Sequence, residues 1–386
     1  MSRHRGATDA DELAAWLRLE QTAGVGAETA RRLLAAFGLP ANIFSTSFSA
    51  LHKIVPERIA YALLAAPSDA TLALIERTLE WLQQPANQLF TLADAGYPQA
   101  LLDIADPPLM LYVKGRAELL ARPALAVVGS RNATVQGIAN ADRFAEILSQ
   151  RGLTIISGLA LGVDAAAHQG ALRGAAGNAE AGSTIAVIGT GADIVYPARN
   201  RGLAHQIAEA GCIVSEYPLG MPGIAANFPR RNRIVSGLAR GVLVVEAAAQ
   251  SGSLITARMA GEQGRDVFAI PGSIHSPLSK GCHQLIKQGA KLVESAQDIL
   301  EELRSFHSPV KVPASVAAGE ALVAIEDTVV STDDELLRQL GYDPVSFDVL
   351  AARCDSDAAS LNGRLLELEL AGLIEVLPGG LYRRLD

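Results

Sequence analysis

Hydrophobic and polar residues follow a regular order through the middle of the chain. Between residues 120 and 300, short apolar runs alternate with stretches of helical periodicity. This order predicts an α/β domain in which helices cover both faces of a doubly wound, mostly parallel sheet. The expected strands are Leu125–Val128, Leu153–Ser157, Thr184–Ile188, Cys212–Ser215, Val242–Glu246 and Val267–Ile270.

The two ends of the chain show other patterns. Residues 10–90 predict helices around a Gly-Val-Gly turn at Gly24–Gly26, similar to a helix-hairpin-helix. Such a turn can offer backbone N–H groups to a phosphate, or it can serve only for packing. Ser305–Asp327 is rich in Pro, Ala, Val and Ser and lacks periodicity, which indicates a linker. The expected divisions are an all-α domain at 1–90, the core at 91–304, a linker at 305–330 and a last domain at 331–386.

The C-terminal pattern is typical of a winged helix. A helix around Leu350 precedes a second one over Ala358–Ala371, and a Gly-Gly turn then leads to Tyr382. The second helix carries Glu367 and Glu369 where a DNA-reading helix would meet phosphates. Because like charges repel, we expect protein docking or oligomerisation at least as much as DNA binding here.

The predicted strands of the core share small residues at their carboxyl ends. The turns that follow them are Gly129–Arg131, Ser157–Gly162, Gly189–Gly191 and Pro271–Ser273. Ligands of open parallel sheets bind at this edge, and glycine there lets backbone N–H groups approach an anion. Tight turns need glycine for steric reasons as well, but four of them on one edge favour a phosphate-binding surface.

The segment from Asn227 to Ala257 joins an aromatic side chain to several cations. It places five polar or aromatic residues directly before an expected short helix: Phe228, Arg230, Arg231, Asn232 and Arg233. An apolar strand then opens onto a Ser-Gly-Ser turn that contains Gly252 and Ser253. Arginine binds phosphate through two parallel N–H bonds, and an aromatic ring can stack a splayed base, typically worth about 1–3 kcal/mol. The segment therefore has the parts of a site for a polyanion with stackable bases.

Within this segment the periodicity separates core from surface. Ile234, Val235 and Leu238 form the expected core face of the helix, and Pro229 suits its first turn. The three arginines cannot all be buried. Asn232 is either a cap or a hydrogen-bond partner within the loop, and Phe228 is either a core aromatic or a loop residue, which its Asn-Phe-Pro context favours.

The run VVGSRNATVQG at residues 127–137 looks like a dinucleotide-binding loop but lacks the Gly-x-Gly-x-x-Gly spacing. The phosphate-binding loop of ATPases is also absent from the sequence, so we expect neither NAD nor ATP and no other cofactor. Arg131 follows Gly129 and Ser130 at the end of a strand, where a phosphate would lie. An arginine at a turn is often only solvated, but this position favours a ligand contact.

A catalytic interpretation has little support. Asp164 and His168 lie four residues apart and share a helix face, which suits an acid/base couple. No candidate nucleophile stands out beside them. We interpret the pair as structural or as support for a neighbouring site, and expect a protein that is not an enzyme.

Charge and cysteine content narrow the class of protein. The net charge is −8, but counting by segment gives about +1 for residues 91–304 and about −6 for 331–386, so the acidity lies mainly at the C-terminus. The histidines and the three cysteines lack metal-ligand spacing, so we expect no metal and reduced thiols in the cytoplasm. The chain has no run of about 18 apolar residues, and its N-terminus lacks the apolar core of a signal peptide, so no contact with a membrane is expected.

Taken together, these motifs resemble the DNA-processing protein A family, also called DprA or Smf. The resemblance begins at Gly96–Gly115 and continues through VVGSR, SGLALGVDAAAH, VIGTGADIVYPARN, SEYPLG and NFPRRNRIVSGLARGVLVVEAAAQSGSLITA. It then extends through FAIPGSIHSPLSKGCHQLIKQGA to the tail LLELELAGLIEVLPGGLYRR. Motifs of this length and order are highly specific.

The resemblance implies an extended Rossmann-like core that forms a homodimer and binds single-stranded DNA. It also implies that the protein protects incoming DNA and loads the recombinase RecA onto it during natural transformation. Arg131 would hold phosphate, Phe228 would stack a base, and Arg230, Arg231 and Arg233 would line the groove. The other expected DNA-binding residues are Gly129, Ser130, Gly158, Asn232, Gly252 and Ser253. Some members carry a lysine shortly before this phenylalanine, where this chain has residues 224–226, Ile-Ala-Ala.

Two rival functions remain open from the sequence. The nucleoside-monophosphate phosphoribohydrolases have a related Rossmann-like core and a similar Gly-Ser-Arg turn. They typically show a Pro-Gly-Gly-x-Gly-Thr loop with a catalytic glutamate, whereas this chain has EAAAQSGSLITA and PGSIHSP. The second rival is a scaffold that acts only through protein contacts, with its basic segment merely solvated.

Overall fold

The structure is a computed structural model that describes residues 10–305, 335–340, 344–354 and 357–385. The chain forms two compact units, one ending at Glu301 and the other made mainly of the residues after it. The expected linker at 305–330 and the extreme N-terminus lie outside the described residues, apart from Ser305 at the end of a helix.

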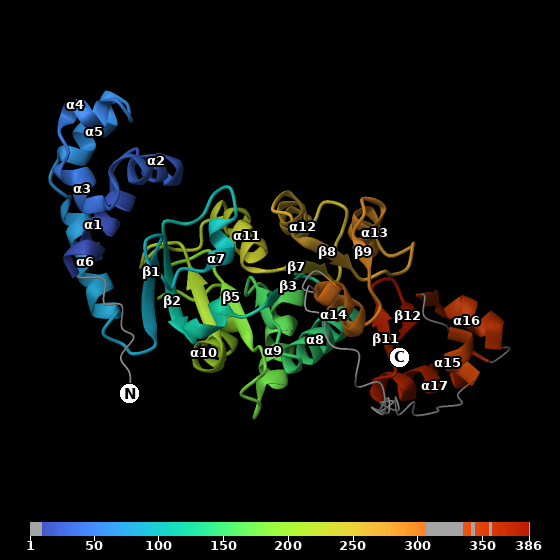
Figure 1. Ribbon diagram of the computed structural model, residues 1–386. Helices are drawn as coiled ribbons and strands as arrows, with labels where there is room; N and C mark the ends of the chain where they lie inside the picture. The colour runs from blue at the N-terminus through green and yellow to red at the C-terminus, as the bar shows by residue number, and fades with distance from the viewer. Residues whose placement is uncertain (1–9, 306–334, 341–343, 355–356, 386) are drawn as a thin grey trace, which may run out of the picture. The chain divides into compact units, whose positions relative to one another are not determined.

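The first unit begins with a small helical domain (Figure 1). Its helices are α1 (Ala10–Gln21), α2 (Ala27–Phe37), α3 (Pro40–Ser45), α4 (Phe48–His52), α5 (Glu57–Leu64) and α6 (Asp69–Trp81). Trp16, Leu17 and Leu33 are buried in one cluster with Met110 and Tyr112 of the neighbouring sheet. The Trp81 ring meets the Tyr112 ring edge-on at 5.9 Å between centroids. The helical domain and the sheet therefore share a continuous core.

In the described part of the chain, nine strands form the sheet of the first unit in the order β1-β2-β6-β5-β4-β3-β7-β8-β9. The strands are β1 (Asn87–Thr91), β2 (Met110–Gly115), β3 (Ala124–Val128), β4 (Thr154–Ser157), β5 (Thr184–Val187), β6 (Cys212–Ser215), β7 (Gly241–Val244), β8 (Asp266–Ala269) and β9 (Lys291–Leu292). Strands β3 to β9 run parallel, whereas β1 and β2 are antiparallel to their neighbours. The six predicted strands are confirmed, with ends that differ by at most two residues. Strands β1, β2 and β9 were not predicted from the sequence.

Helices cover both faces of this sheet, as predicted for an α/β fold (Figure 1). The helices of the core are α7 (Gln99–Leu102), α8 (Val135–Gln150), α9 (Val163–Ala175), α10 (Arg201–Ala210), α11 (Asn227–Leu238), α12 (Ser253–Glu262), α13 (Lys280–Lys287) and α14 (Ala296–Ser305), with 3₁₀ turns at Ala117–Ala121, Ala198–Asn200 and Pro277–Ser279. Helices α7, α11, α12 and α13 lie on one side, and α8, α9 and α10 lie on the other. Because both faces are covered, the central strands are apolar on both faces, and all five residues of β3 are buried.

Helices α8 and α9 approach closely through two glycines. A side chain at Gly170 would overlap the backbone carbonyl of Asp142, and one at Gly174 would approach that of Glu146. Arg173, between the two glycines, forms ion pairs with Asp142 and with Glu146. Glycine is needed here for the packing distance between helices, although it lowers intrinsic helix propensity.

The second unit has the winged-helix fold expected from the sequence. Its elements are α15 (Glu335–Leu340), β10 (Val345–Ser346), α16 (Phe347–Cys354), α17 (Ala358–Leu370), β11 (Ile374–Leu377) and β12 (Leu381–Arg384). The strands pair antiparallel in the order β10-β12-β11, and the Gly-Gly turn joins β11 to β12. Asp357 caps α17 by accepting hydrogen bonds from the N–H groups of Ala359 and Ser360. Glu367 and Glu369 are exposed on α17, as the sequence predicts.

No single helix among the described residues is long and apolar enough to cross a membrane. Helices α5 and α6 pass that test only as a pair, by length and composition, and they are bent by 58° relative to each other.

Candidate nucleic-acid interface

The strand order places a topological switch at β3. From β3 the chain proceeds through β4, β5 and β6 on one side, and it then crosses through α11 to β7 on the other side. In open parallel sheets, the crevice at such a point, beyond the carboxyl ends of the strands, is where ligands bind. The turns after β3 and β7 flank this crevice, and the turns after β4 and β5 extend the same edge.

The turn after β3 is held from both sides and leaves Arg131 exposed. The Ser130 N–H donates to the Glu246 carbonyl over 2.7 Å, and the Ser130 carbonyl accepts from the Val163 N–H over 3.1 Å. A Cβ atom at Gly129 would lie 2.6 Å from a methyl group of Val163, so only glycine fits there. The backbone is therefore fixed while the Arg131 side chain faces solvent at the edge of the sheet.

The Phe228–Arg233 run lies inside a helix, so the prediction that it precedes the helix was wrong. Helix α11 begins at Asn227, one residue before the phenylalanine. Pro229 is preorganised for a first helical turn, and arginine is a good helix former, so the run continues the helix backwards. Ile234, Val235 and Leu238 are buried, as predicted.

Helical periodicity brings Arg231 onto the same face as Ile234, Val235 and Leu238, and it is 5% exposed. Its Nη1 donates to the Val187 carbonyl at the end of β5, and its Nε donates to the Asn232 side-chain oxygen over 3.1 Å. The guanidinium covers Gly158, where any side chain would overlap it. Asn232 is thus neither a cap nor a loop residue but a helical partner of Arg231.

Arg231 interacts electrostatically with Asp164 and with Arg131, which have opposite effects on its pKa. Burial lowers the pKa of Arg231, the Asp164 carboxylate opposes that shift, and the positive charge of Arg131 adds to it. Asp164 accepts hydrogen bonds from the N–H groups of Gly158 and Ala160 over 3.1 and 3.3 Å. Burial raises the pKa of Asp164, and Arg231 opposes that change. Arg231 and Asp164 together fix the turn after β4.

Arg233 is also buried and belongs to a chain of ion pairs. Its guanidinium donates to both oxygens of Glu216 over 3.1 and 2.6 Å and to Asp106 over 3.1 Å. Asp106 in turn accepts from Arg31 of α2 over 2.5 Å. The side chains of Arg233 and Glu216 are 9% and 8% exposed. This chain of charges connects the helical domain to α11.

Arg230 is the exposed arginine of the three. Its guanidinium has no hydrogen bond or ion pair with another described residue. Of the cations in the α11 run, Arg230 therefore remains available to a ligand together with Arg131, while Arg231 and Arg233 support the backbone behind them.

Phe228 packs against a second aromatic residue, Tyr196, which was not predicted from the sequence. The Tyr196 ring lies 5.3 Å from the Phe228 ring, centroid to centroid, and Tyr196 is 52% exposed. Both rings press on glycines, because a Cβ at Gly189 would meet Phe228 and one at Gly223 would meet Tyr196. The two rings, called the aromatic platform below, lie over the end of β5. The sequence does show an aromatic residue, Tyr196, shortly after the glycine turn at residues 189–191, and this position could have suggested a second stacking ring.

The remaining expected residues lie at the start of α12, after β7. Gly252 is exposed with open space around it, and Ser253 is buried. The Ser253 hydroxyl lies 2.7 Å from the hydroxyl of Ser251. This turn borders the crevice on the side opposite to the turn after β4.

The pair Asp164 and His168 does not form a couple. His168 is fully buried and its Nδ1 lies 2.7 Å from the Thr184 hydroxyl, which itself donates to the Ile155 carbonyl. Burial lowers the pKa of His168 to about 3, so the ring is neutral at pH 7. Asp164 and His168 therefore have the structural role that was predicted from the sequence, each with its own partners.

The candidate residues thus lie along one edge that runs from β5 through β4 and β3 to β7. Neighbouring strands are about 4.8 Å apart, so this edge extends roughly 15 Å from the aromatic platform to the turn after β7. It offers stacking rings at β5, a buried cation behind β4 and an exposed arginine at β3. The arrangement suits an extended anionic polymer with flat bases.

Comparison with known proteins identifies the same segments. A family model described as DNA recombination-mediator protein A matches residues 88–304, and one described as DprA winged helix domain matches residues 322–380. Protein Smf of Escherichia coli (strain K12) is 44% identical over 322 residues, which is 80% of each chain. The solved structure of DNA processing protein A from Streptococcus pneumoniae has a TM-score of 0.64 and 38% identity, and covers 76% of this chain and 98% of its own. DNA processing protein A from Helicobacter pylori, solved to describe its single-stranded DNA binding mode, has a TM-score of 0.51 and 31% identity, and covers 57% of this chain and 98% of its own.

Proposed function

The chain belongs to the DNA recombination-mediator protein A family, and from that premise we propose that it binds single-stranded DNA along the β5–β4–β3–β7 edge. The observation that carries this proposal is that the exposed Arg131, after β3, and the aromatic platform, over the end of β5, lie on one edge with only the turn after β4 between them. Arg131 and Arg230 contact phosphates, and Phe228 and Tyr196 stack bases. The structure of the Helicobacter pylori relative describes a single-stranded DNA binding mode, which supports single-stranded DNA as the ligand proposed for this chain.

The buried candidates act on the strand indirectly. Arg231 and Asp164 hold the turn after β4, and Arg233 holds α11 against the helical domain. The backbone of Gly129, Ser130 and Gly158 lies at the same edge, in the turns after β3 and β4. Gly252 and Ser253 offer the start of α12, where the positive end of the helix dipole favours phosphate.

Binding of oligo-dT and of a matched duplex across a salt series tests the site. We expect preference for the single strand and an affinity that falls with salt. Arg131→Ala should lower the salt slope by about one, whereas Phe228→Ala should weaken binding with little change in slope. Arg151→Ala is the matched control, because Arg151 is exposed just before β4, at the opposite edge of the sheet. Equal binding of both DNA forms, unaffected by Arg131→Ala and Phe228→Ala, contradicts the proposal.

The protein acts by binding rather than by catalysis. Asp164 and His168 bind different partners, so the acid/base couple considered from the sequence is not assembled. Incubation with purine and pyrimidine nucleoside monophosphates should release no free base. Measurable release would instead favour the phosphoribohydrolase type of enzyme.

Loading of RecA onto the bound strand, during natural transformation in the cytoplasm, completes the proposed role. Its support is membership of the family, and the buried free thiols of Cys212 and Cys282 fit a reducing compartment. The protein should shorten the lag of RecA filament assembly on single-stranded DNA, measured by fluorescence. If the lag is unchanged while DNA binding is intact, RecA loading is contradicted and the DNA-binding proposal stands.

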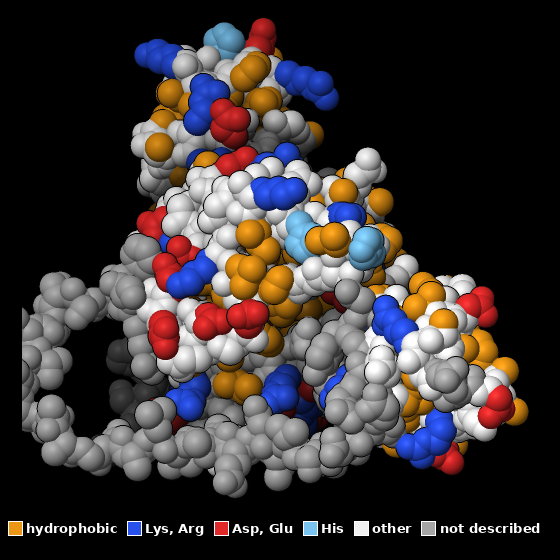
Figure 2. Space-filling model, turned by 90° about the vertical axis from the view of Figure 1, so that its right-hand side faces the viewer, with side chains coloured by type: hydrophobic (Ala, Val, Ile, Leu, Met, Phe, Trp, Pro, Cys, Tyr) orange, Lys and Arg blue, Asp and Glu red, His pale blue; other side chains and the backbone are white. Residues whose placement is uncertain are grey.

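A homodimer is part of the same proposal. Exposed hydrophobic side chains gather on the face that Figure 2 shows, close to histidine side chains. Ile274 and Leu292 are 67% and 44% exposed near the β9 end of the sheet, and a pocket of about 510 Å³ lies between α12 and α13. Such surfaces on soluble proteins often mark protein contacts. Light scattering should give twice the chain mass, and Ile274→Glu with Leu292→Glu should halve it.

A further inference from the structure

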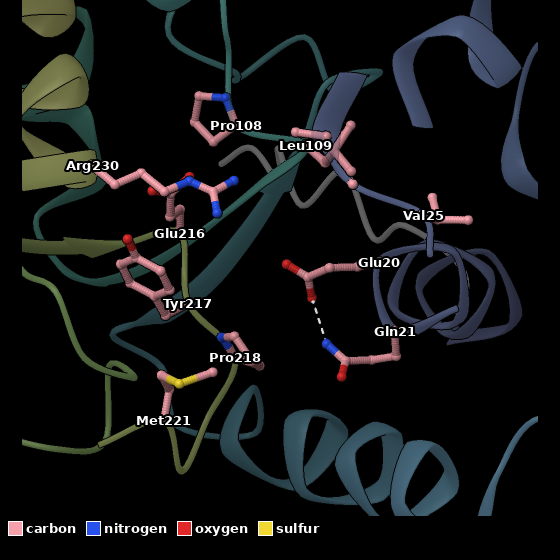
Figure 3. Close-up of a pocket in the computed structure, with 12 residues that line it drawn as sticks. Glu20, Gln21, Val25, Pro108, Leu109, Glu216, Tyr217, Pro218, Met221 and Arg230 are labelled. Carbon is pink, nitrogen blue, oxygen red and sulfur yellow. Dashed lines mark hydrogen bonds between the residues drawn. The ribbon is translucent and has the colours of Figure 1, made fainter. Parts of the chain in front are cut away.

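A pocket of about 240 Å³ opens between the helical domain and the core (Figure 3). The helical domain contributes Glu20 and Gln21 at the end of α1, Val25 and Gly26 of the Gly-Val-Gly turn, and Ala27 after it. The core contributes Glu216, Tyr217 and Arg230, with apolar walls from Pro108, Leu109, Pro218 and Met221. Sites for drug-sized ligands typically measure about 300–1,000 Å³, so this pocket suits a single flat ring system.

Two opposite charges face this pocket without bonding to each other. Figure 3 shows the Glu20 carboxylate and the Arg230 guanidinium directed into the pocket from opposite sides. The Glu20 carboxylate accepts a hydrogen bond of 3.3 Å from the Gln21 amide, on the neighbouring residue. Glu216, by contrast, is already held by Arg233. The pocket therefore presents one carboxylate with remaining acceptor capacity and one guanidinium.

The carboxylate is held where its charge is disfavoured. Burial raises the pKa of Glu20 to about 7, the negative charge of Glu216 adds to this shift, and the Gln21 hydrogen bond and Arg230 oppose it. A ligand that donates hydrogen bonds to the carboxylate would relieve this cost, because hydrogen bonding to the charged form stabilises it.

The pocket adjoins the proposed DNA-binding edge through two hydrogen bonds. The Tyr217 hydroxyl donates to the carbonyl of Asn227, the residue before Phe228 in α11, over 3.1 Å. The carbonyl of Met221 accepts from the N–H of Gly191, in the turn after β5, over 2.9 Å. The walls of the pocket are thus hydrogen-bonded to the segments that carry the aromatic platform. A strand lying on the platform can turn one base into the pocket while Arg230 holds the adjacent phosphate.

We propose that the pocket is a base-reading subsite that accepts one guanine of the bound strand. The Watson–Crick edge of guanine presents two adjacent donors, N1–H and the 2-amino group, which match the two oxygens of the Glu20 carboxylate. Adenine, cytosine and thymine each offer such a carboxylate one donor group on that edge. The apolar walls contact the faces of the ring. This inference rests on the proposed single-strand binding.

Fluorescence anisotropy with labelled oligo-dT that carries one central guanine tests the subsite. The guanine strand should bind about tenfold more tightly than oligo-dT, the discrimination typical of one bidentate base contact. Inosine in its place lacks the 2-amino group and should lose most of this gain. 7-Deazaguanine keeps the Watson–Crick edge and should retain it.

Substitution assigns the preference to the carboxylate. Glu20→Gln keeps the size of the side chain and should abolish the guanine preference while leaving oligo-dT affinity unchanged. Glu76→Gln, on the exposed surface of α6, is the matched control and should change neither. Equal affinities for the guanine strand and oligo-dT, or a preference that survives Glu20→Gln, overturn the subsite while single-strand binding stands. Failure to bind any single strand overturns the proposed function and the subsite with it.

Discussion

Replacing Arg233 by methionine separates a supporting role from a DNA-contacting one. The substitution keeps an unbranched apolar stem and removes the guanidinium that bonds both oxygens of Glu216 and one oxygen of Asp106. Glu216 then remains as a buried carboxylate, since its side chain is only 8% exposed. Asp106 is 41% exposed and keeps its bond to Arg31, so it is affected less.

The expected loss of unfolding free energy follows from these two contributions. Breaking a buried ion pair by removing one partner typically costs about 3–5 kcal/mol, because the other charge stays buried. The exposed pair with Asp106 adds less than about 1 kcal/mol. Since whole domains are stable by about 5–15 kcal/mol, Arg233→Met should remove a large share of the stability of the first unit. Adding Glu216→Leu should restore most of it, since no unpaired charge is then buried.

Urea unfolding measures this loss through two signals. Tryptophan fluorescence reports the helical domain, where both Trp16 and Trp81 lie, and far-ultraviolet circular dichroism reports the whole chain. The salt slope of oligo-dT binding should be the same for Arg233→Met as for the wild type, whereas Arg230→Ala should lower it by about one. A stability loss below about 1 kcal/mol, together with a reduced salt slope, would refute this reasoning and make Arg233 a phosphate contact.

Three further predictions follow from the structure. Because the pKa of His168 is lowered from its ordinary value of 6.5 to about 3, its contribution to stability is present above pH 6.5 and is lost as the pH falls. Between pH 7 and pH 4.5, the wild type should lose about 3 kcal/mol more unfolding free energy than His168→Gln, measured by urea unfolding at both pH values, and equal losses would contradict this. In thermal unfolding, Gly170→Ala should destabilise the protein by about 1–3 kcal/mol because of its contact with α8, whereas Gly261→Ala, in open space on α12, should be neutral or stabilise it by up to about 1 kcal/mol. A change of the same sign in the unfolding free energy of both variants would contradict the packing described. Tyr196→Ala should weaken oligo-dT binding about 5- to 50-fold with an unchanged salt slope, and unaltered affinity would remove Tyr196 from the aromatic platform.

The core strands were predictable because burial on both faces leaves apolar runs with small residues at their ends. β1 was missed because Asn87–Thr91 mixes polar and apolar residues. β2 is an apolar run that ends in glycine, and it was missed because it lies before the region of alternating strands and helices that begins near residue 120. The winged helix was predictable because its Gly-Gly turn and leucine spacing are local features. Relations between distant segments, such as β2 with the helical domain, do not appear in any local pattern.

The candidate interface was predictable as a set of residues but not as an arrangement. The glycine turns and Arg131 follow from strand order, since parallel strands end at one edge. The burial of Arg231 and Arg233 could not be foreseen, because their partners, Val187 and Glu216, are far away in the sequence. The same holds for Tyr196, whose role depends on the ring of Phe228 in another element.

The shared core between the helical domain and β2 has a consequence for where this chain can be cut. A shortened chain that starts at residue 91 would lose all but the last residue of β1, and it would uncover Met110 and Tyr112 on the face of β2. An open strand edge beside a bare apolar face is a template for self-association. The change in composition near residue 90 therefore does not separate two independently folding domains. We expect a fragment cut at that position to aggregate.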